Sequence, residues 1–435
     1  MYGYATDRTA LKADPNARSD WEYRTTDEIF TPRVTGNRIV FVQSGEYGTQ
    51  IVAVRPDDGH VAWQYHLEKE RRLMRLPTID LRQVTLYSAR FAEERNEDSP
   101  LETRLILLRT ADGSVERTVT LPTRDRIVHS PFIRDGLLYF VSYPQDENFY
   151  DSTRTPGYAC ALDLATGRLK WKTALSMRMS RATDLQTLTI NSRSVNPWIA
   201  RTTEIVADES RMYFGYPNGR VYAINLNDGL VAWQFRTADR MMISPELRDG
   251  TLYFGSGDWN FYALNPATGR LKWKVATGAD AGYAAPLYDG DRLYITSGEY
   301  QLLPISSIVM MTNADANDYT DHTTAALFAV NSSDGKVLWR HNFDSVAYTP
   351  ILRDDTLTIV DSRGNITELE AKNGNVRRQA QLQTIVRAAI PYDNKLIVHG
   401  SNIPFFGRGG HYRDLIQGNA DASSAFDSLE KKSLP

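Results

Sequence analysis

The sequence predicts an all-β protein, an eight-bladed β-propeller made of four-stranded antiparallel blades. Three observations lead to this fold: a motif that recurs along most of the 435 residues, a tryptophan at a fixed distance after a turn glycine, and chain ends that complement each other. Repeats of this kind bury their cores against their neighbours, so one domain can exceed the usual domain length. Aromatic residues, which favour strands, make up 11% of the chain.

Each repeat consists of a proline, a tight turn such as Asp-Gly, an aromatic-rich strand, a second strand, and a turn glycine followed by tryptophan. Residues 244–273 form a clear copy, and residues 130–171 form another with an insertion inside it. Proline suits the start of a strand because it lacks an N–H, and the glycine-containing pairs supply the positive φ of tight hairpins. Each unit is therefore interpreted as four antiparallel strands, A to D, with tryptophan on strand D.

The number of blades follows from the strands that begin after the first turn of each unit. Eight such strands begin near Arg38, Val84, Leu137, Arg211, Thr251, Arg292, Thr356 and Lys395.

The tryptophans on strand D are expected to be structural anchors between neighbouring blades. They are Trp21, Trp63, Trp171, Trp233, Trp273 and Trp339. Two further turns carry Arg117 and Arg378 at the tryptophan position, which brings the anchors to eight. Truncating a buried tryptophan typically costs about 3–5 kcal/mol. Docking is therefore expected to be weaker between blades 2 and 3 and between blades 7 and 8.

The two ends of the chain are predicted to share blade eight. Residues 385–402 hold strands A and B, while residues 9–25 hold a strand C at Thr9–Leu11 and a strand D at Trp21. Joining them closes the ring and leaves only short strand edges exposed. The propeller would span residues 1–408. Residues 409–435 would be a C-terminal extension, with the polar composition of a flexible tail.

This repeat resembles the PQQ-type propeller repeat of quinoproteins, including its tryptophan docking motif, over about residues 9–400. Two branches share the repeat: PQQ-dependent dehydrogenases, and non-enzymatic propellers such as the BamB-type outer-membrane assembly lipoproteins. The dehydrogenases are typically longer and carry a vicinal disulfide, a Ca²⁺ site and a catalytic Asp. Cys160 is the only cysteine, so a vicinal disulfide is impossible here. The resemblance therefore favours the BamB type, although neither a signal nor a lipidated Cys is visible.

Other chemistry has little support in the sequence. The net charge of −3 gives no broad basic field for nucleic acid. No nucleophile elbow is present, and the seven histidines lack metal-ligand spacing. The acidic residues between Asn313 and Asp321 are interpreted as a solvated loop, with Ca²⁺ binding as the alternative. We therefore expect no catalytic, cofactor-binding or metal-binding residues.

The long insertions all fall in the B–C and D–A connections, which lie on the same face of a propeller. Residues 64–76, 172–203 and 234–243 are D–A connections, and residues 90–102, 143–157 and 299–324 are B–C connections. Long loops in compact domains are usually functional, although loops also tolerate neutral insertions. This face is therefore the expected partner-binding surface.

Apolar and methionine residues concentrate in these connections, where flexible side chains suit an adaptable contact surface. The candidate partner-binding residues are Arg71, Leu73, Met74, Met177, Met179, Met241, Met242, Leu302, Leu303, Ile305 and Met310. Thioether binding of Cu(I) is an alternative role for the methionines.

Together these features predict a non-enzymatic scaffold in the periplasm, associated with the outer membrane and binding protein partners. No stretch reaches the roughly 18 apolar residues of a membrane helix, so membrane association would require a lipid anchor or a partner. Two alternatives are a dehydrogenase that holds PQQ and Ca²⁺ in the central channel, and a structural subunit of another envelope complex.

Overall fold

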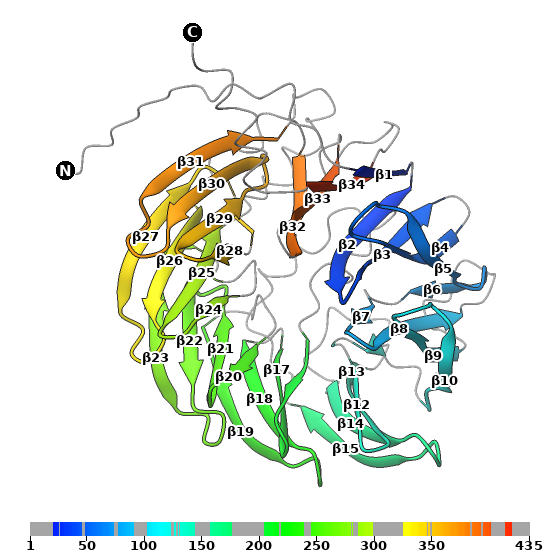
Figure 1. Ribbon diagram of the computed structural model, residues 1–435. Coiled ribbons are helices and arrows are strands. Elements are labelled where there is room, and N and C mark those ends of the chain that lie inside the picture. Colours follow the sequence, from blue (N-terminus) through cyan, green and yellow to red (C-terminus); the bar gives the residue numbers. More distant parts are fainter. Residues whose placement is uncertain are drawn as a thin grey trace, which may run out of the picture.

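The computed structural model describes residues 21–25, 27–45, 48–73, 77–90, 102–122, 126–127, 129, 131–143, 157–175, 204–216, 219–238, 245–279, 281, 286–298, 325–345, 347–348, 350–382, 385–392, 395–401 and 414–419. Within these ranges the regular elements are all strands, and they form eight antiparallel sheets arranged around a common centre (Figure 1).

We number the sheets in chain order. Sheet 1 contains β2 (Glu28–Thr35), β3 (Arg38–Gly45), β4 (Gly48–Val54) and β5 (Val61–His66). Sheet 2 contains β6 (Arg71–Leu73), β7 (Thr78–Ile79), β8 (Gln83–Arg90), β9 (Glu102–Arg109) and β10 (Val115–Thr120). Sheet 3 contains β11 (Arg126–Ile127), β12 (Phe132–Arg134), β13 (Leu137–Tyr143), β14 (Gly157–Asp163) and β15 (Leu169–Leu175). Sheet 4 contains β16 (Val206–Ala207), β17 (Arg211–Tyr216), β18 (Arg220–Asn225) and β19 (Val231–Arg236).

The remaining sheets continue the same pattern. Sheet 5 contains β20 (Glu246–Arg248), β21 (Thr251–Gly255), β22 (Asn260–Leu264) and β23 (Leu271–Ala276). Sheet 6 contains β24 (Leu287–Asp289), β25 (Arg292–Gly298), β26 (Ala325–Asn331) and β27 (Val337–Phe343). Sheet 7 contains β28 (Ile351–Arg353), β29 (Thr356–Val360), β30 (Asn365–Glu370) and β31 (Val376–Gln381). Sheet 8 contains β32 (Ile385–Tyr392), β33 (Lys395–Ser401), β34 (Asp414–Asn419) and β1 (Trp21–Thr25).

The sheets confirm the predicted unit of four antiparallel strands, with strand A nearest the centre and strand D outermost (Figure 1). In sheets 2 and 3, strand A is interrupted, so β6 and β7 both pair with β8, and β11 and β12 both pair with β13. Strand B begins at the predicted residue in seven sheets; in sheet 2 it begins at Gln83, one residue before Val84.

Sheet 8 requires a correction to the sequence interpretation. Its third strand is β34, which pairs with β33 on one side and with β1 on the other. The sequence had placed Thr9–Leu11 at this position and residues 409–435 outside the repeat. Thr9–Leu11 lies outside the described residues. A strand at this position is needed because β33 and β1 would otherwise leave a row of backbone groups unpaired.

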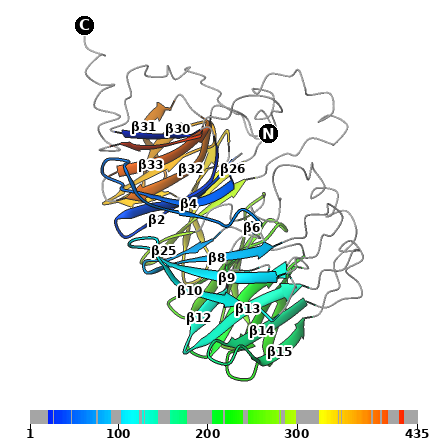
Figure 2. The same cartoon turned by 90° about the vertical axis from the view of Figure 1, so that its right-hand side faces the viewer.

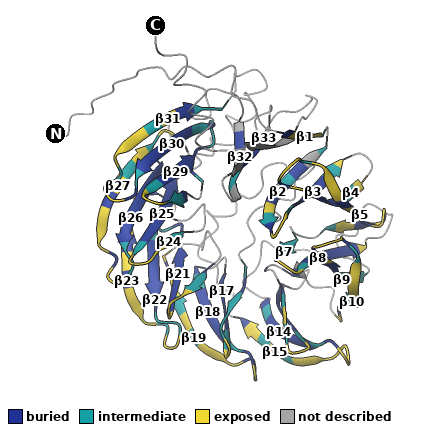
Figure 3. Ribbon diagram, viewed as in Figure 1, coloured by how far each residue is buried: buried dark blue, intermediate teal, exposed yellow. Residues whose placement is uncertain are grey.

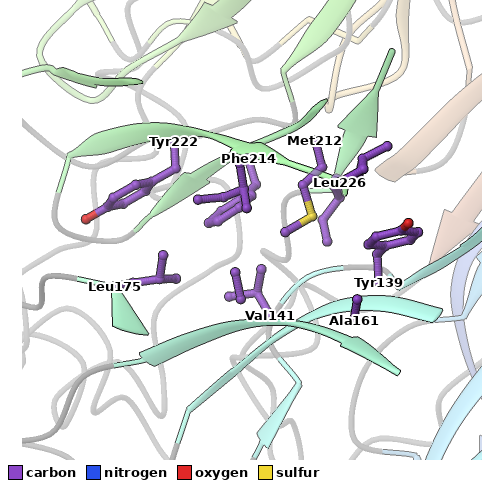
Figure 4. Packing of buried hydrophobic residues seen from close by; sticks show 11 residues of the cluster. Tyr139, Val141, Ala161, Leu175, Met212, Phe214, Tyr222 and Leu226 are labelled. Carbon is purple, nitrogen blue, oxygen red and sulfur yellow. The ribbon is translucent and has the colours of Figure 1, made fainter. Parts of the chain in front are cut away.

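The hydrophobic core is divided into clusters that lie between neighbouring sheets. One cluster joins sheets 3 and 4, where Val141 and Leu175 face Met212, Phe214 and Tyr222 (Figure 4). Similar clusters join each consecutive pair from sheet 1 to sheet 8, and a further cluster joins sheet 8 to sheet 1 through Ile397 and Ile39. Exposed residues concentrate on the outer strands (Figure 3).

All six tryptophans of strand D lie between neighbouring sheets. Each indole Nε1 donates to a carbonyl three residues before the turn glycine of the next sheet, at 2.8–3.0 Å. A Cβ on those glycines would lie within 3.0 Å of the indole. The glycine therefore serves two purposes: it adopts a positive φ, and it leaves room for the ring. The glycines are Gly59, Gly113, Gly229, Gly269, Gly335 and Gly374.

The two arginines at the tryptophan position behave differently from each other. Arg117 donates from Nη2 to the Leu164 carbonyl at 2.7 Å, which is the acceptor position that tryptophan uses elsewhere. A Cβ on Gly167 would meet nothing within 4 Å, so the hydrogen bond is kept and the ring contact is lost. Arg378 instead pairs with Glu368 of its own sheet, Nε to Oε2, at 2.8 Å. In sheet 8, strands C and D come from opposite ends of the chain, so no short C–D turn offers an acceptor.

Candidate binding face

One rim of the sheets carries the ends of strands B and D and the starts of strands A and C; we call it the BC–DA face. In sheet 3, Ser142 near the end of β13 pairs with Tyr158, and Gly157 at the start of β14 pairs with Leu175 at the end of β15. Antiparallel pairing therefore brings these strand ends to one rim in every sheet. Figure 2 shows the strands of sheets 2 and 3 from the side. The predicted long connections all join strand ends at this face.

Most of the candidate partner-binding residues lie outside the described part of the chain. They are Met74, Met177, Met179, Met241, Met242, Leu302, Leu303, Ile305 and Met310. Leu73 is described: it is half-buried in β6 and packs against the cluster between sheets 1 and 2.

Arg71 also lies on this face, but its guanidinium is committed to internal ion pairs. Its side chain is only 1% exposed, and Nε lies 3.0 Å from Oε2 of Glu68. Nη2 donates to Glu102, whose carboxylate also accepts from Arg104 at 3.0 Å. Strand β6 holds Arg71 there by pairing it with Arg90 of β8. Arg71 is therefore a buried structural residue, which corrects its assignment as a partner contact.

The electrostatics of this network favour its ionised form. Burial alone would raise the pKa of Glu102, but hydrogen bonds and charge from Arg71 and Arg104 outweigh it and lower the pKa below its usual value. One donor of Arg71, Nη1, is buried without a hydrogen-bond partner. Removing Glu102 would therefore leave a buried cation with a single remaining partner.

Trp259 is a feature of this face that the sequence analysis did not single out. It lies in the B–C turn of sheet 5, its side chain is exposed, and its φ of 64° is left-handed. For a residue with a Cβ this conformation costs about 1–2 kcal/mol. Its carbonyl accepts from the Thr277 N–H at 2.8 Å and from the Thr277 hydroxyl at 2.9 Å. The sequence offers one signal, because Trp259 stands one residue before strand C, where Gly219 and Gly364 stand in two other units.

The neighbouring carboxylate orders the same turn. Asp258 Oδ2 accepts from the Tyr262 hydroxyl at 2.6 Å and from the Ala238 N–H at 3.0 Å. Burial, and then the hydrogen bond to Asp258, raise the pKa of Tyr262 above its usual range. The Ala238 bond ties the segment after β19 to the B–C turn of the next sheet, so two sheets hold Trp259 in place.

Among the described residues, no three His, Cys, Asp or Glu side chains come together as metal ligands would. Arg33 of sheet 1 lies 3.9 Å from Glu204, which precedes sheet 4, so this ion pair reaches across the space between inner strands.

In the part of the chain with described structure, no helix is long and apolar enough to cross a membrane.

A family model described as outer membrane protein assembly factor BamB matches residues 3–192, 100–239, 156–315 and 217–390. The chain belongs to this family. The match confirms the predicted PQQ-like repeat and the resemblance to the BamB type. No curated protein sequence matches the chain.

Several solved structures are similar in fold to this chain, but their sequence identity to it is low. BamB from Moraxella catarrhalis is 14% identical with a TM-score of 0.51, and the match covers 92% of this chain and 97% of that one. A quinohemoprotein alcohol dehydrogenase from Pseudomonas putida is 13% identical with a TM-score of 0.54, covering 92% and 76%. A computationally designed protein, Ika8, is 11% identical with a TM-score of 0.56, covering 92% and 99%. These likenesses support a β-propeller fold.

Proposed function

We propose that this chain is a non-enzymatic protein-binding scaffold of the bacterial cell envelope, built as one closed eight-bladed propeller. The eight sheets would be its blades. Two observations support closure: β1 and β34 from opposite ends of the chain pair in sheet 8, and sheet 8 packs against both sheet 7 and sheet 1. A closed ring is a rigid platform, which lets loops on one rim carry the recognition.

The BC–DA face is the proposed docking surface. Its support is the one-sided distribution of long connections, together with the exposed and conformationally restricted Trp259. The predicted contact residues Met74, Met177, Met179, Met241 and Met242 belong to these connections. Leu302, Leu303, Ile305 and Met310 lie in the apolar run of the connection between β25 and β26. Arg71 is not part of the proposal.

The proposed partner is a β-barrel outer-membrane assembly protein, and the proposed location is the periplasmic side of the outer membrane. The observation that carries this proposal is the family match over residues 3–390, because the family is described as an outer-membrane protein assembly factor. Attachment to the membrane would come through the partner or a lipid anchor.

The experiment is a cross-linked pull-down of the tagged chain from its native envelope, with mass spectrometry of the captured proteins. We expect a β-barrel assembly protein as the dominant partner, cross-linked to the BC–DA face. A different complex as the dominant partner would contradict the assembly role and favour the alternative of a structural subunit elsewhere in the envelope.

The absence of enzymatic activity is a separate proposal, and it addresses the dehydrogenase alternative. Its support is the single cysteine, which cannot form the vicinal disulfide typical of the enzymes that the repeat resembles. We expect no dye-linked alcohol oxidation after incubation with PQQ and Ca²⁺. Turnover that requires both additions would contradict the proposal.

A further inference from the structure

The B–C turn of sheet 5 carries a tryptophan where two other sheets carry glycine. The turns are equivalent because each spans the same number of residues between paired positions, Gly255↔Phe261, Gly215↔Val221 and Val360↔Ile366. Two residues before the second partner stand Trp259, Gly219 and Gly364, with φ of 64°, 74° and 83°. The carbonyl of each accepts a backbone N–H at 2.8 Å from the segment that follows strand D.

Glycine satisfies this turn without strain, so the fold itself does not require an indole at this position. The Trp259 side chain is 50% exposed, and it belongs to none of the clusters between the sheets. A large residue held in a sparsely populated backbone conformation at a surface is a recognised mark of function. Because Thr277 and the Asp258 hydrogen bonds fix the backbone of the turn, the position from which the indole projects is set before any partner arrives.

Two cations on the strands connected to this turn indicate the chemistry of its partner. Arg236 ends β19, two residues before Ala238, whose N–H binds Asp258 next to the tryptophan. Lys274 lies on β23, paired with Tyr262 of the strand that follows the turn. Both cations are exposed. The one carboxylate of the turn, Asp258, already accepts hydrogen bonds from Tyr262 and Ala238.

We propose that Trp259 is the anchor of the docking surface and receives an apolar side chain from an acidic segment of the partner protein. This inference rests on the proposed function and adds to it the anchoring residue and the partner's chemistry. The indole provides a rigid apolar surface with one N–H donor, and tryptophan is enriched among residues that dominate binding energy. Arg236 and Lys274 would attract the acidic groups of that segment.

The test is isothermal titration calorimetry of the full chain. The probe is the purified soluble portion of the β-barrel outer-membrane assembly protein from the same organism. We expect Trp259→Gly to weaken binding by about 30-fold and Trp259→Phe to keep most of the affinity. The matched control is Leu230→Ser, because Leu230 is also an exposed apolar residue but lies by a C–D turn on the opposite face. That control should change the affinity by less than about twofold.

Two further measurements test the parts of the proposal separately. Trp259→Gly should leave the thermal transition within about 2 °C of wild type, because lost packing of the half-exposed ring is offset by relief of the left-handed backbone. Charge reversal with Arg236→Glu and Lys274→Glu should weaken binding about tenfold at low ionic strength and less in high salt.

Each outcome decides between the two levels of the proposal. If wild type binds and Trp259→Gly binds equally well, the anchor is overturned while the proposed function stands. If wild type does not bind the probe, the proposed partner fails, and the anchor as stated fails with it. If Trp259→Gly lowered the thermal transition by more than about 5 °C, Trp259 would be a packing residue and the anchor would be overturned. Stronger binding after charge reversal of Arg236 and Lys274 would overturn the inference that the partner segment is acidic. If Trp259→Gly kept its affinity for the protein probe but lost binding to phosphatidylglycerol vesicles, Trp259 would bind a lipid surface, and the proposed protein partner of this residue would be overturned.

Discussion

Gly335 and Gly167 occupy the same position in two C–D turns but face different neighbours, which allows the docking of tryptophan to be tested. Gly335 has φ of 74°, and a Cβ on it would lie 2.7 Å from the indole of Trp273. Gly167 has φ of 69°, and a Cβ there would meet nothing within 4 Å because Arg117 replaces the tryptophan. Alanine at either position incurs the left-handed cost, about 1–2 kcal/mol.

Only Gly335→Ala also has to displace an indole. Trp273 is 6% exposed, and its Nε1 donates to the Ser332 carbonyl at 2.9 Å. Losing that hydrogen bond costs about 1 kcal/mol, and complete loss of a buried tryptophan costs about 3–5 kcal/mol. We therefore expect Gly335→Ala to lower the free energy of unfolding by about 2–7 kcal/mol in total, which adds the left-handed cost to the partial or complete loss of indole docking, against about 1–2 kcal/mol for Gly167→Ala.

The assay is equilibrium unfolding in urea, followed by circular dichroism, with both variants and wild type measured side by side. In a Trp273→Ala background, Gly335→Ala should cost no more than Gly167→Ala does, because no indole remains to be displaced. Equal losses for Gly335→Ala and Gly167→Ala in the otherwise wild-type chain would refute the reasoning that the indoles dock on these turns.

Three further predictions concern the other structural features. Arg117→Trp should raise the free energy of unfolding by about 1–2 kcal/mol, since it restores the ring contact with Gly167 while keeping the hydrogen bond; an unchanged urea midpoint would contradict this. Glu102→Gln should destabilise the chain by up to about 3 kcal/mol at neutral pH, because buried Arg71 keeps only Glu68. The lowered pKa of Glu102 means that its stabilisation is present above the unfolded pKa and is lost as pH falls through the folded pKa. Acid titration of the variant should therefore show a smaller loss of stability at low pH, and an unchanged profile would count against the network. Ending the chain after residue 413 should remove β34 and lower the thermal transition, whereas ending it after residue 419 should not; equal transitions would show that β34 is dispensable.

The repeated strands were predictable because each carries its own local signals. In sheets 1, 3, 5, 6 and 7 a turn with positive φ precedes strand B, and in sheets 1, 3, 4, 5 and 6 strand D carries a tryptophan four residues after a glycine. These signals report short-range backbone geometry, and they placed the starts of strand B to within one residue. The docking role of the tryptophans follows from the same spacing, since the indole of one unit needs the glycine of the next.

The remaining features depend on contacts between residues far apart in the chain. No tryptophan follows β34 in the sequence, and the position of this strand is determined by pairing with β33 and β1. In the sequence, Arg71 lies in a charged stretch that is typical of a surface. Its burial depends on the ion pair with Glu102, which lies 31 residues later in the chain. Trp259 resembles the other strand aromatics in sequence, and its exposure becomes evident only when its turn is compared with the turns of Gly219 and Gly364.

The central claim is that the chain binds a protein partner through its BC–DA face. Hydrogen–deuterium exchange of the full chain, with and without the soluble portion of the assembly protein, tests this claim most directly. We predict that the partner protects the B–C turn at residues 256–260 and the segments after strands D, and leaves the C–D turns unchanged. Protection confined to the C–D turns around Gly59, Gly269 and Gly335, on the opposite rim, would contradict the account.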